Sequence, residues 1–449
     1  MKSISVSIKT VRQSMRMDGS YHNADINIYD NTLHNHSSHC LNFYCSNIYT
    51  TGRGRRVYTR PERGVPFLSN SDMMAQNPLM SCNYMSRKYG YDESSVLKGG
   101  MILTGRVGAI GQTAFVPNYW EKYKMMGSDN IIRIVVKDEF KNGFIYAYLA
   151  SKYGNLSFWK HATGGVQPFI TDKMVANLPI PDFPASFQQE VDDLIQESAR
   201  LREEAADALQ QAIQQVEDII PYPSKKNVGC VSSRTILSSH NRRFEAIYYI
   251  SEGHDIEKYI YKNFKWKPLG QVCEDISRPD IFKRYYVQNG IVFLGGADIF
   301  LASPDSKKQL SKTKTTNITS LAIKENTILI PRSGTIGNVA WAHAGHAQKL
   351  ASEHVIRLQP NDILRGGYIY AFLSSSIGKA LIQKHIFGSV IQHIEPPHLK
   401  LIPIPIIEDS IIDNIHKLVI EYSKKVGKAI ENERKAISMI EQEIESWTK

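Results

Sequence analysis

Two long segments of the chain, residues 188–220 and 409–447, carry apolar residues three or four positions apart among Glu, Gln, Lys and Ala. This spacing puts the apolar side chains on one face, so it predicts two amphipathic helices, each with a seam for a partner helix. At about 1.5 Å per residue, each would span roughly 45–60 Å. One alternative is that each helix packs on its own domain. Because both are too long for one globule, we expect them to pair as an antiparallel coiled coil through Val191, Leu194, Leu201, Val216, Ile415, Val419, Tyr422, Val426 and Ile430.

The rest of the chain repeats itself. GVPFLSNSDMM (64–74) matches GIVFLGGADIF (290–300), and GFIYAYL (143–149) matches GYIYAFL (367–373). Similar blocks in the same order and at nearly constant spacing indicate a tandem duplication. Each copy mixes short apolar runs with helical segments, so we expect an α+β fold. The two predicted globular domains are 1–183 and 230–406, the long helices are 184–220 and 407–449, and the linker is 221–229.

A glycine-spaced turn occurs in each copy, as RVGAIG (106–111) and RSGTIG (332–337). Each follows an apolar run and precedes a short β-branched or aromatic run, QTAFVP or NVAWAH. A dinucleotide-binding turn needs the spacing GxGxxG and a helix directly after it, and neither is found here. The pattern instead predicts a mixed sheet with glycine hairpins, in which glycine allows a positive φ.

The composition adds a moderate basic charge. Lys and Arg number 54 against 44 Asp and Glu, which favours a nucleic-acid partner. No apolar run approaches the length that a bilayer requires, and Met1–Arg16 lacks the apolar core of a signal peptide. The five cysteines form no CxxC pair, which favours a reducing cytosol. We therefore expect a cytoplasmic protein with no membrane segment.

The glycine motifs carry a resemblance to a known family. GGMILTGRVGAIGQTAFV and ENTILIPRSGTIGNVAWA, followed by FIYAYL or YIYAFL, then LPIP or IPIP and a long helix, resemble the specificity (S) subunits of type I restriction-modification systems. The resemblance covers most of the chain, in both halves. It implies a prokaryotic protein with no catalytic site, whose two target recognition domains each read one half of a split DNA sequence. The helices would set the spacing between the halves and dock partner subunits.

The resemblance also implies partners and cofactors outside this chain. Two methyltransferase (M) subunits would carry S-adenosylmethionine and methylate adenine. Restriction (R) subunits would use ATP and magnesium to complete an endonuclease active in phage defence. Two alternatives stay open: a specificity partner of a related fused, type IIB-like restriction-methylation enzyme, and a coiled-coil adaptor that reads no DNA. We expect no enzyme activity in the chain itself, which has no Walker or HExxH motif.

Sequence reading requires polar side chains on loops that differ between the copies, since arginine binds phosphates and guanine and glutamine binds adenine. The loops 53–63, 277–286 and 303–316 are rich in arginine or lysine, and WKHATGGVQ (159–167) pairs with QKHIFGSVIQH (383–393). The alternatives are solvated loops and arginines paired with carboxylates. The predicted DNA-binding residues are Arg53, Arg55, Arg56, Arg60, Arg106, Lys160, His161, Gln167, Arg278, Lys283, Arg284, Lys307, Lys308, Lys312, Lys314, Arg332, Lys384, His385 and Gln392.

His34, His36, His39, Cys40 and Cys45 form a histidine-rich segment. Their spacing fits no standard zinc site, so we expect an irregular loop and no metal. HNHSSHCLNFYC (34–45) also has no recognisable counterpart near WKPLGQVCEDIS (266–277), which leaves the beginning of the first recognition domain undefined.

Overall fold

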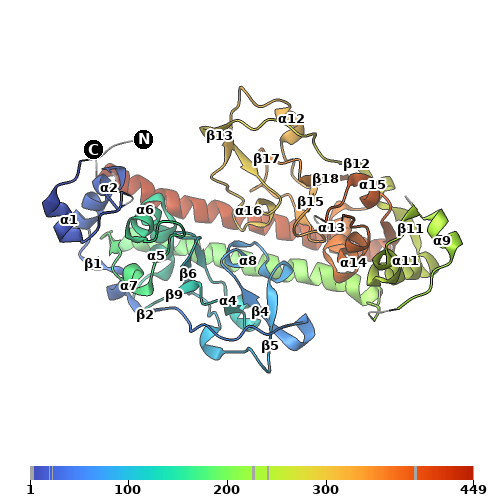
Figure 1. Ribbon diagram of the computed structural model, residues 1–449, viewed down its shortest axis with the longest axis horizontal. Helices are drawn as coiled ribbons and strands as arrows, with labels where there is room; N and C mark the ends of the chain where they lie inside the picture. Colours follow the sequence, from blue (N-terminus) through green and yellow to red (C-terminus); the bar gives the residue numbers. More distant parts are fainter. Residues whose placement is uncertain are drawn as a thin grey trace. The chain divides into compact units, whose positions relative to one another are not determined.

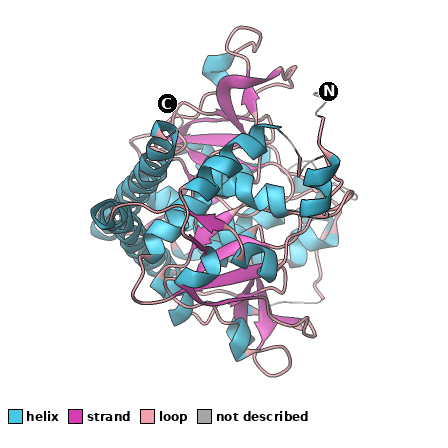
Figure 2. Ribbon diagram, turned by 90° about the vertical axis from the view of Figure 1, so that its left-hand side faces the viewer, coloured by secondary structure: helices cyan, strands magenta, loops and turns pink. Residues whose placement is uncertain are grey.

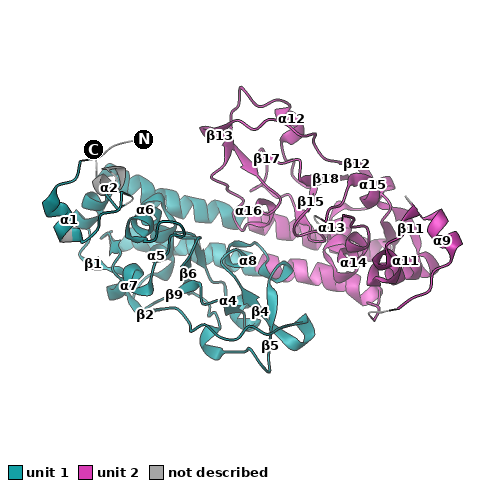
Figure 3. Ribbon diagram, in the orientation of Figure 1, with its two compact units in different colours: residues 1–203, 428–449 teal, residues 204–427 magenta. Residues whose placement is uncertain are grey.

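The computed structural model describes residues 5–19, 21–22, 24–224, 228–239, 242–388 and 392–447. The chain folds into two compact units, coloured separately in Figure 3. Unit 1 comprises residues 1–203 and 428–449, and unit 2 comprises residues 204–427. Each unit therefore combines one copy of the repeat with a part of both long helices.

The described residues of unit 1 form two four-stranded sheets and one strand pair. The first sheet is antiparallel and has the order β2 (Cys45–Tyr49), β9 (Ile131–Val136), β6 (Ile102–Gly105), β7 (Thr113–Phe115). The second has the order β3 (Tyr58–Thr59), β5 (Asn83–Ser86), β4 (Gly64–Leu68), β8 (Met126–Gly127), with β8 parallel to β4. β1 (His39–Cys40) pairs with β10 (Pro179–Ile180). The strands β1, β2, β4, β5, β6 and β9 are labelled in Figure 1. β4 and β6 are buried at every position, which explains their continuous apolar runs in the sequence.

The core of unit 1 centres on helix α5 (Asn142–Ala150), which is buried from Gly143 to Leu149. Ser151 ends this helix and begins α6 (Lys152–His161), because its side chain caps the new helix by accepting a hydrogen bond from the Gly154 amide. The other short helices of the unit are α1 (Ile8–Ser14), α2 (Ala24–Asn35), α3 (Leu41–Tyr44), α4 (Asn118–Lys122) and α7 (Asp172–Ala176).

Unit 2 repeats this arrangement. Its antiparallel sheet has the order β12 (Cys273–Ser277), β18 (Val355–Pro360), β15 (Ile328–Pro331), β16 (Ala340–Trp341). A second sheet has the order β14 (Gln309–Leu310), β13 (Tyr286–Leu294), β17 (Leu350–Ala351), with β17 parallel to β13. β11 (Lys265–Pro268) pairs with β19 (Pro403–Ile406). The short helices are α9 (Ser233–Ser238), α10 (Ala246–Ile250), α11 (Glu252–Asn263), α12 (Ile318–Leu321), α13 (Gly366–Ser374), α14 (Ser376–Lys384) and α15 (Pro396–Leu399).

Strands lie among short helices and long loops in both units, and Figure 2 shows this mixture. The expected α+β fold class is therefore confirmed.

The two copies correspond further toward their beginnings than the sequence indicates. β1 pairs with β10 shortly before β2 begins, and β11 pairs with β19 shortly before β12 begins. The strand register places Cys45 opposite Val136 and Cys273 opposite Pro360, and it shifts directly after each cysteine. The expectation that residues 34–45 lack a counterpart in residues 266–277 is wrong, because the backbone pairing is the same where the side chains differ.

The long helices are α8 (Ala185–Ile219) and α16 (Asp409–Ser446). In unit 2, Glu204 of α8 forms an ion pair with Lys425 of α16 at 2.8 Å. Further along, Gln215 accepts a hydrogen bond from Asn414 at 3.0 Å. Residue numbers rise along one helix while they fall along the other, so the helix segments of unit 2 run antiparallel. No helix in the described residues has the length and apolar composition needed to cross a membrane.

The helix segments of unit 1 have the same relation. The ring of Phe183, before α8, lies 5.1 Å from the ring of Trp447, after α16. Ser198 then donates a hydrogen bond to the carbonyl of Ala429 at 2.9 Å. Among the nine seam residues, Leu194 is half-buried and the other eight are buried. The apolar side chains of both helices are therefore buried within the units to which the helix segments belong.

The glycine turns form hairpins in both units. β6 and β7 are antiparallel neighbours on either side of the first turn, and β15 and β16 flank the second. Gly108 and Gly111 have φ angles of 74° and 73°, and Gly334 and Gly337 have 81° and 106°. Residues with a side chain rarely adopt positive φ angles, so these turns need glycine. The predicted glycine hairpins are confirmed.

His346 in unit 2 provides a pH-dependent contribution to stability. It is buried, and its Nε2 hydrogen-bonds with the carbonyl of Ile299 at 2.9 Å. Burial disfavours the imidazolium and lowers the pKa of His346 to about 4. The unfolded chain, with a histidine pKa of about 6.5, takes up this proton more readily. Stability is therefore retained above about pH 6.5 and lost as the pH falls toward 4.

Between about pH 7.5 and about pH 5, we expect His346 to lower the free energy of unfolding of the wild type by about 2 kcal/mol. His346→Gln, which keeps a hydrogen-bond donor for the Ile299 carbonyl, should not show this loss. Melting temperatures of the two proteins at both pH values measure this difference. Equal acid sensitivity of the wild type and the variant would contradict the prediction.

Candidate nucleic-acid interface

Each glycine turn lies against the second loop that the sequence singled out. In unit 1, loop 162–170 closes on itself, because the Phe169 amide donates to the Thr163 carbonyl at 2.7 Å and the reverse bond measures 2.8 Å. The next amide, of Ile170, donates to the carbonyl of Arg106 at 2.9 Å. These bonds join turn 106–111 and loop 162–170 into one feature, which we call the turn–loop edge of unit 1.

Unit 2 has an equivalent turn–loop edge, formed by turn 332–337 and by loop 386–394 outside residues 389–391, which are not described. Phe387 and His393 exchange backbone hydrogen bonds of 3.0 and 2.9 Å. The Ile394 amide then donates to the carbonyl of Arg332 at 3.0 Å. Turn and loop, which the sequence presented as separate candidates, thus belong to a single feature in each unit.

The two edges expose different side chains. Val166 and Gln167 are exposed on the first edge, and Gln392 is exposed on the second. An exposed amide carries both a donor and an acceptor, which is what bidentate binding of adenine requires. Arg106 is half-buried and forms no ion pair with any residue that the structure describes, whereas Arg332 pairs with Glu395 at 2.7 Å. Of the two arginines that precede the glycine turns, only Arg332 therefore fits the alternative of an arginine paired with a carboxylate.

Glu395 fixes two of the predicted arginines. Its carboxylate accepts hydrogen bonds from Arg278 at 2.8 Å and from Arg332 at 2.7 Å. Burial acts to raise the pKa of Glu395, but the hydrogen bonds and charges of the two arginines outweigh it and lower that pKa. Glu395 therefore stays ionised at neutral pH and holds both guanidinium groups at the base of the edge.

Three predicted DNA contacts lie in the interior. Lys160 forms an ion pair with Asp30, and Lys384 forms one with Glu257. The exposed fractions of Lys160, Lys384 and His385 are 7%, 2% and 2%. A buried, paired ammonium cannot reach a phosphate without abandoning its partner. We therefore withdraw Lys160, Lys384 and His385 from the DNA-contacting residues.

His161, next to Lys160, is half-buried, and burial lowers its pKa. It is therefore neutral at neutral pH and adds no positive charge to the first edge.

The arginine-rich loops make one equivalent contact in each unit. Arg56 pairs with Asp129 at 2.5 Å and lies over the ring of Phe67. Arg284 pairs with Glu353 at 2.6 Å and lies over the ring of Phe293. The remaining basic candidates are exposed and form no ion pair with a described residue; they are Arg53, Arg55, Arg60, Lys283, Lys307, Lys308, Lys312 and Lys314.

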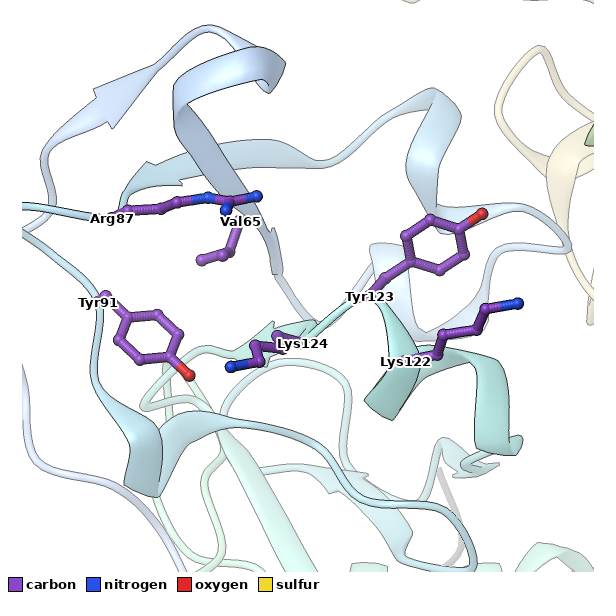
Figure 4. Close-up of a pocket in the computed structure, with 6 residues that line it drawn as sticks. All are labelled: Val65, Arg87, Tyr91, Lys122, Tyr123 and Lys124. Carbon is purple, nitrogen blue, oxygen red and sulfur yellow. The ribbon is translucent and has the colours of Figure 1, made fainter. Parts of the chain in front are cut away.

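Unit 1 also contains a basic pocket of about 400 Å³ that the sequence analysis missed. Figure 4 shows Arg87, Tyr91 and Lys124 arranged around the space beside Val65, with Lys122 and Tyr123 directed away from them. None of the described residues lining the pocket is acidic, so the pocket suits an anion such as a DNA phosphate. The basic and aromatic runs RKYGY (87–91) and EKYK (121–124) are the sequence signal that indicates it.

The turn at Lys124 has a counterpart in unit 2 that carries other side chains. Residues 122–124 correspond to residues 346–348, where the sequence reads His, Ala, Gln instead of Lys, Tyr, Lys. Lys124 and Gln348 both adopt positive φ angles, of 51° and 63°. A shared backbone with different side chains is what two units need if they bind different sequences on one scaffold.

The histidine-rich segment is not the irregular loop that the sequence predicted, because residues 34–45 contain the end of α2, all of β1 and α3, and the first residue of β2. Its side chains also have other partners. His39 stacks on Phe43 with ring centroids 3.7 Å apart, and His36 stacks on Trp447 at 4.4 Å. Burial raises the pKa of the Cys45 thiol to about 12, which disfavours the thiolate that a metal ion would bind. In the part of the chain that the structure describes, no three His, Cys, Asp or Glu side chains come close enough to hold a metal.

Comparison with known proteins gives one family match. Residues 261–442 match the model of the type I restriction modification DNA specificity domain. No curated protein sequence matches the chain.

Several solved structures are similar to the chain at low identity. The type I restriction-modification S subunit from M. genitalium is 12% identical over 91% of this chain and 93% of its own, with a TM-score of 0.33. The HsdS subunit from Thermoanaerobacter tengcongensis is 15% identical over 90% and 94%, with a TM-score of 0.28. The type IIG restriction endonuclease BpuSI is 10% identical over 41% and 29%, with a TM-score of 0.30.

Proposed function

We infer that this chain, which belongs to the specificity subunits of type I restriction-modification systems, reads a two-part DNA sequence with one unit for each part. The family assignment rests on the DNA specificity domain matched over residues 261–442 and on the tandem copy of the same strand arrangement in the first half. A specificity subunit supplies sequence recognition, and other subunits supply the chemistry.

The duplicated turn–loop edge is the observation that carries this proposal. Both units hold turn and loop together with equivalent backbone hydrogen bonds, yet the amino-acid sequences of the two loops differ at most positions. Two similar but non-identical DNA-binding edges suit a target whose two halves differ in sequence. Exposed arginines and lysines on the neighbouring loops add the phosphate contacts that supply most of the affinity for DNA.

We further propose that α8 and α16 dock two M subunits. The duplication gives each unit an equivalent pair of antiparallel helix segments, and equivalent surfaces bind equivalent partners. S-adenosylmethionine would bind to the M subunits, and ATP and magnesium would serve R subunits. The adenine methylation and DNA cleavage of the assembled complex would then follow the sequence that this chain selects.

A genome-wide map of methylated bases, with and without this gene, tests the proposal. We expect methylation to disappear at one split motif, made of two short blocks around a fixed gap. If the chain co-purifies with an M subunit that is active in the same cells, and the map is nevertheless unchanged, the proposal is wrong.

The basic pocket of unit 1 makes a measurable prediction. Lys122→Ala combined with Lys124→Ala should weaken DNA binding by the full chain about tenfold. The slope of the logarithm of the binding constant against the logarithm of the salt concentration should also become smaller by about one for each lysine removed. The weakening should be similar for all sequences, because phosphates are common to all DNA. Titrations at several salt concentrations measure both effects.

Lys98→Ala with Lys141→Ala is the matched control, since both lysines are exposed in unit 1 and do not line the pocket. An equal loss of affinity in the control pair would show that general charge, and not the pocket, is responsible.

A further inference from the structure

A group of charged and aromatic side chains closes around the base of the turn–loop edge in unit 1. Arg16 binds Asp18 through Nε and Nη2, at 2.5 and 2.7 Å. The same Nη2 donates to the carbonyl of Ala162 at 2.8 Å, at the first residue of loop 162–170. The guanidinium lies over the ring of Tyr21, 4.9 Å from its centroid. A bidentate ion pair thus fixes this arginine while one of its N–H groups holds the loop.

A second cation completes the group. Lys160, near the end of α6, forms an ion pair with Asp30 of α2 and lies 5.1 Å from the centroid of the Tyr21 ring. Both partners of this pair are almost fully buried, so separating them would leave unpaired charge in the interior. We call Arg16, Asp18, Tyr21, Asp30 and Lys160 the clasp of unit 1.

Unit 2 contains an equivalent clasp. Arg243 pairs with Glu245 at 3.1 Å and donates to the carbonyl of Ile386 at 2.6 Å. Arg243 and Lys384 lie 4.7 and 4.5 Å from the centroid of the Tyr248 ring. Lys384 forms an ion pair with the carboxylate of Glu257 on α11. In both units the arginine donates to the backbone carbonyl of the first loop residue, Ala162 or Ile386. The same loop is hydrogen-bonded to the glycine turn.

The clasps share their chemistry although the surrounding sequence differs. RMDGSYH (16–22) and RFEAIYY (243–249) have in common an arginine, an acidic residue two positions later and a tyrosine. The loops that they hold, ATGGVQPFI (162–170) and IFGSVIQHI (386–394), differ at most positions. A constant support therefore carries a variable loop.

We propose that Arg16 and Arg243 are positioning residues for DNA recognition: each fixes the base of its loop, so that the exposed glutamine, Gln167 or Gln392, is presented to the DNA in one geometry. This inference rests on the function proposed above. Loop 162–170 contains two consecutive glycines; the other hydrogen bonds described for it join backbone groups, and its two ends, Ala162 and Ile170, are buried in the core. Ordering a loose loop during binding costs affinity for the correct sequence and weakens discrimination against others.

Hydrogen exchange on the full chain tests the clasps without DNA. Arg16→Gln removes the bidentate pair and the hold on the loop. We expect the amides of Phe169 and Ile170 to exchange at least about tenfold faster, while those of His393 and Ile394 keep their protection. Arg243→Gln should give the reverse pattern.

Arg200→Gln is the matched control for hydrogen exchange. It breaks an exposed ion pair with Glu197 on α8 and should alter neither loop.

Selection of bound duplexes from a random DNA library tests the effect on recognition. We expect Arg16→Gln to lower discrimination against mismatches about tenfold in one half of the selected sequence, and Arg243→Gln to do so in the other half. Melting temperatures close to that of the wild type should accompany this loss, which a general loss of folding would not produce. The milder variants Asp18→Asn and Glu245→Gln change half-exposed carboxylates, and they should act in the same direction if an arginine variant does not fold.

Wild-type exchange rates in the loop of the altered unit would overturn the inference. So would an equal loss of discrimination in both halves from each single variant. If the wild-type chain selects no DNA sequence at all, the proposed function fails, whereas hydrogen exchange still decides whether the two arginines fix their loops.

Discussion

Val419→Asp is expected to break the pairing of α8 and α16 in unit 2. The Val419 side chain is completely buried on α16, in the same stripe as Tyr422 and Val426. An aspartate there would have to lose its hydration or take up a proton, and either costs free energy. We expect the free energy of unfolding to fall by more than about 4 kcal/mol, visible as a lower melting temperature and a loss of helical circular dichroism. Co-purification of an M subunit should be lost as well.

Lys417→Asp is the matched control for this experiment. Lys417 is exposed on the same helix, two positions away, so its replacement should change stability by no more than about 0.5 kcal/mol. A Val419→Asp protein that melts like the wild type would show that the seam is assigned wrongly. A Val419→Asp protein that melts at a lower temperature but still binds the M subunit would support the seam assignment. It would contradict the proposal that the M subunits dock on these helices.

Lys384→Met should lower the free energy of unfolding by nearly as much, because it leaves the carboxylate of Glu257 without its ion-pair partner. The Lys384 side chain is 1% exposed, and its partner Glu257 is 13% exposed. Burial lowers the pKa of Lys384, although the nearby carboxylate of Glu257 opposes the shift. Without the ammonium, the carboxylate stays in the interior with no counter-charge, and removing one partner of such a pair typically costs about 3–5 kcal/mol. Urea unfolding of the full chain measures the loss.

The double variant Lys384→Met with Glu257→Gln separates charge from packing. Because no net charge is left behind, we expect it to recover most of the stability that the single variant loses. A double variant as unstable as Lys384→Met alone would mean that lost packing is responsible. Lys160→Met and Asp30→Asn provide the corresponding pair in unit 1.

Much of the fold could be predicted because its signals are local or repeated. The spacing of apolar residues along 188–220 and 409–447 indicates helices whatever their surroundings. The two glycine turns indicate hairpins because a positive φ favours one residue type. The order of the repeated blocks indicates two similar domains, since a duplicated sequence folds in the same way twice.

The beginnings of the two domains show where this reasoning fails. Residues 34–45 and 266–277 share little sequence, yet their strands pair with equivalent partners. A β-ladder is held by backbone hydrogen bonds, which leave little trace in the side chains. Comparing the copies residue by residue could not detect this correspondence.

The candidate site was predictable in kind but not in detail. The sequence indicated basic loops and the pair of glutamines; Gln167 and Gln392 are exposed, and their contact with DNA stays a prediction. It placed Lys160 and Lys384 on the same surface, whereas each is buried against a carboxylate more than a hundred residues earlier in the chain. Glu395, which holds Arg278 and Arg332, is likewise distant from both in the sequence.

The sequence by itself determined the duplicated architecture, the helices and the glycine hairpins, because periodicity, turn chemistry and repeats are written in consecutive residues. Only the tertiary structure decided which cations face solvent and which are held by carboxylates, and it alone revealed the two clasps and the basic pocket. The reason is that burial and ion pairing depend on residues that folding brings together from distant parts of the chain.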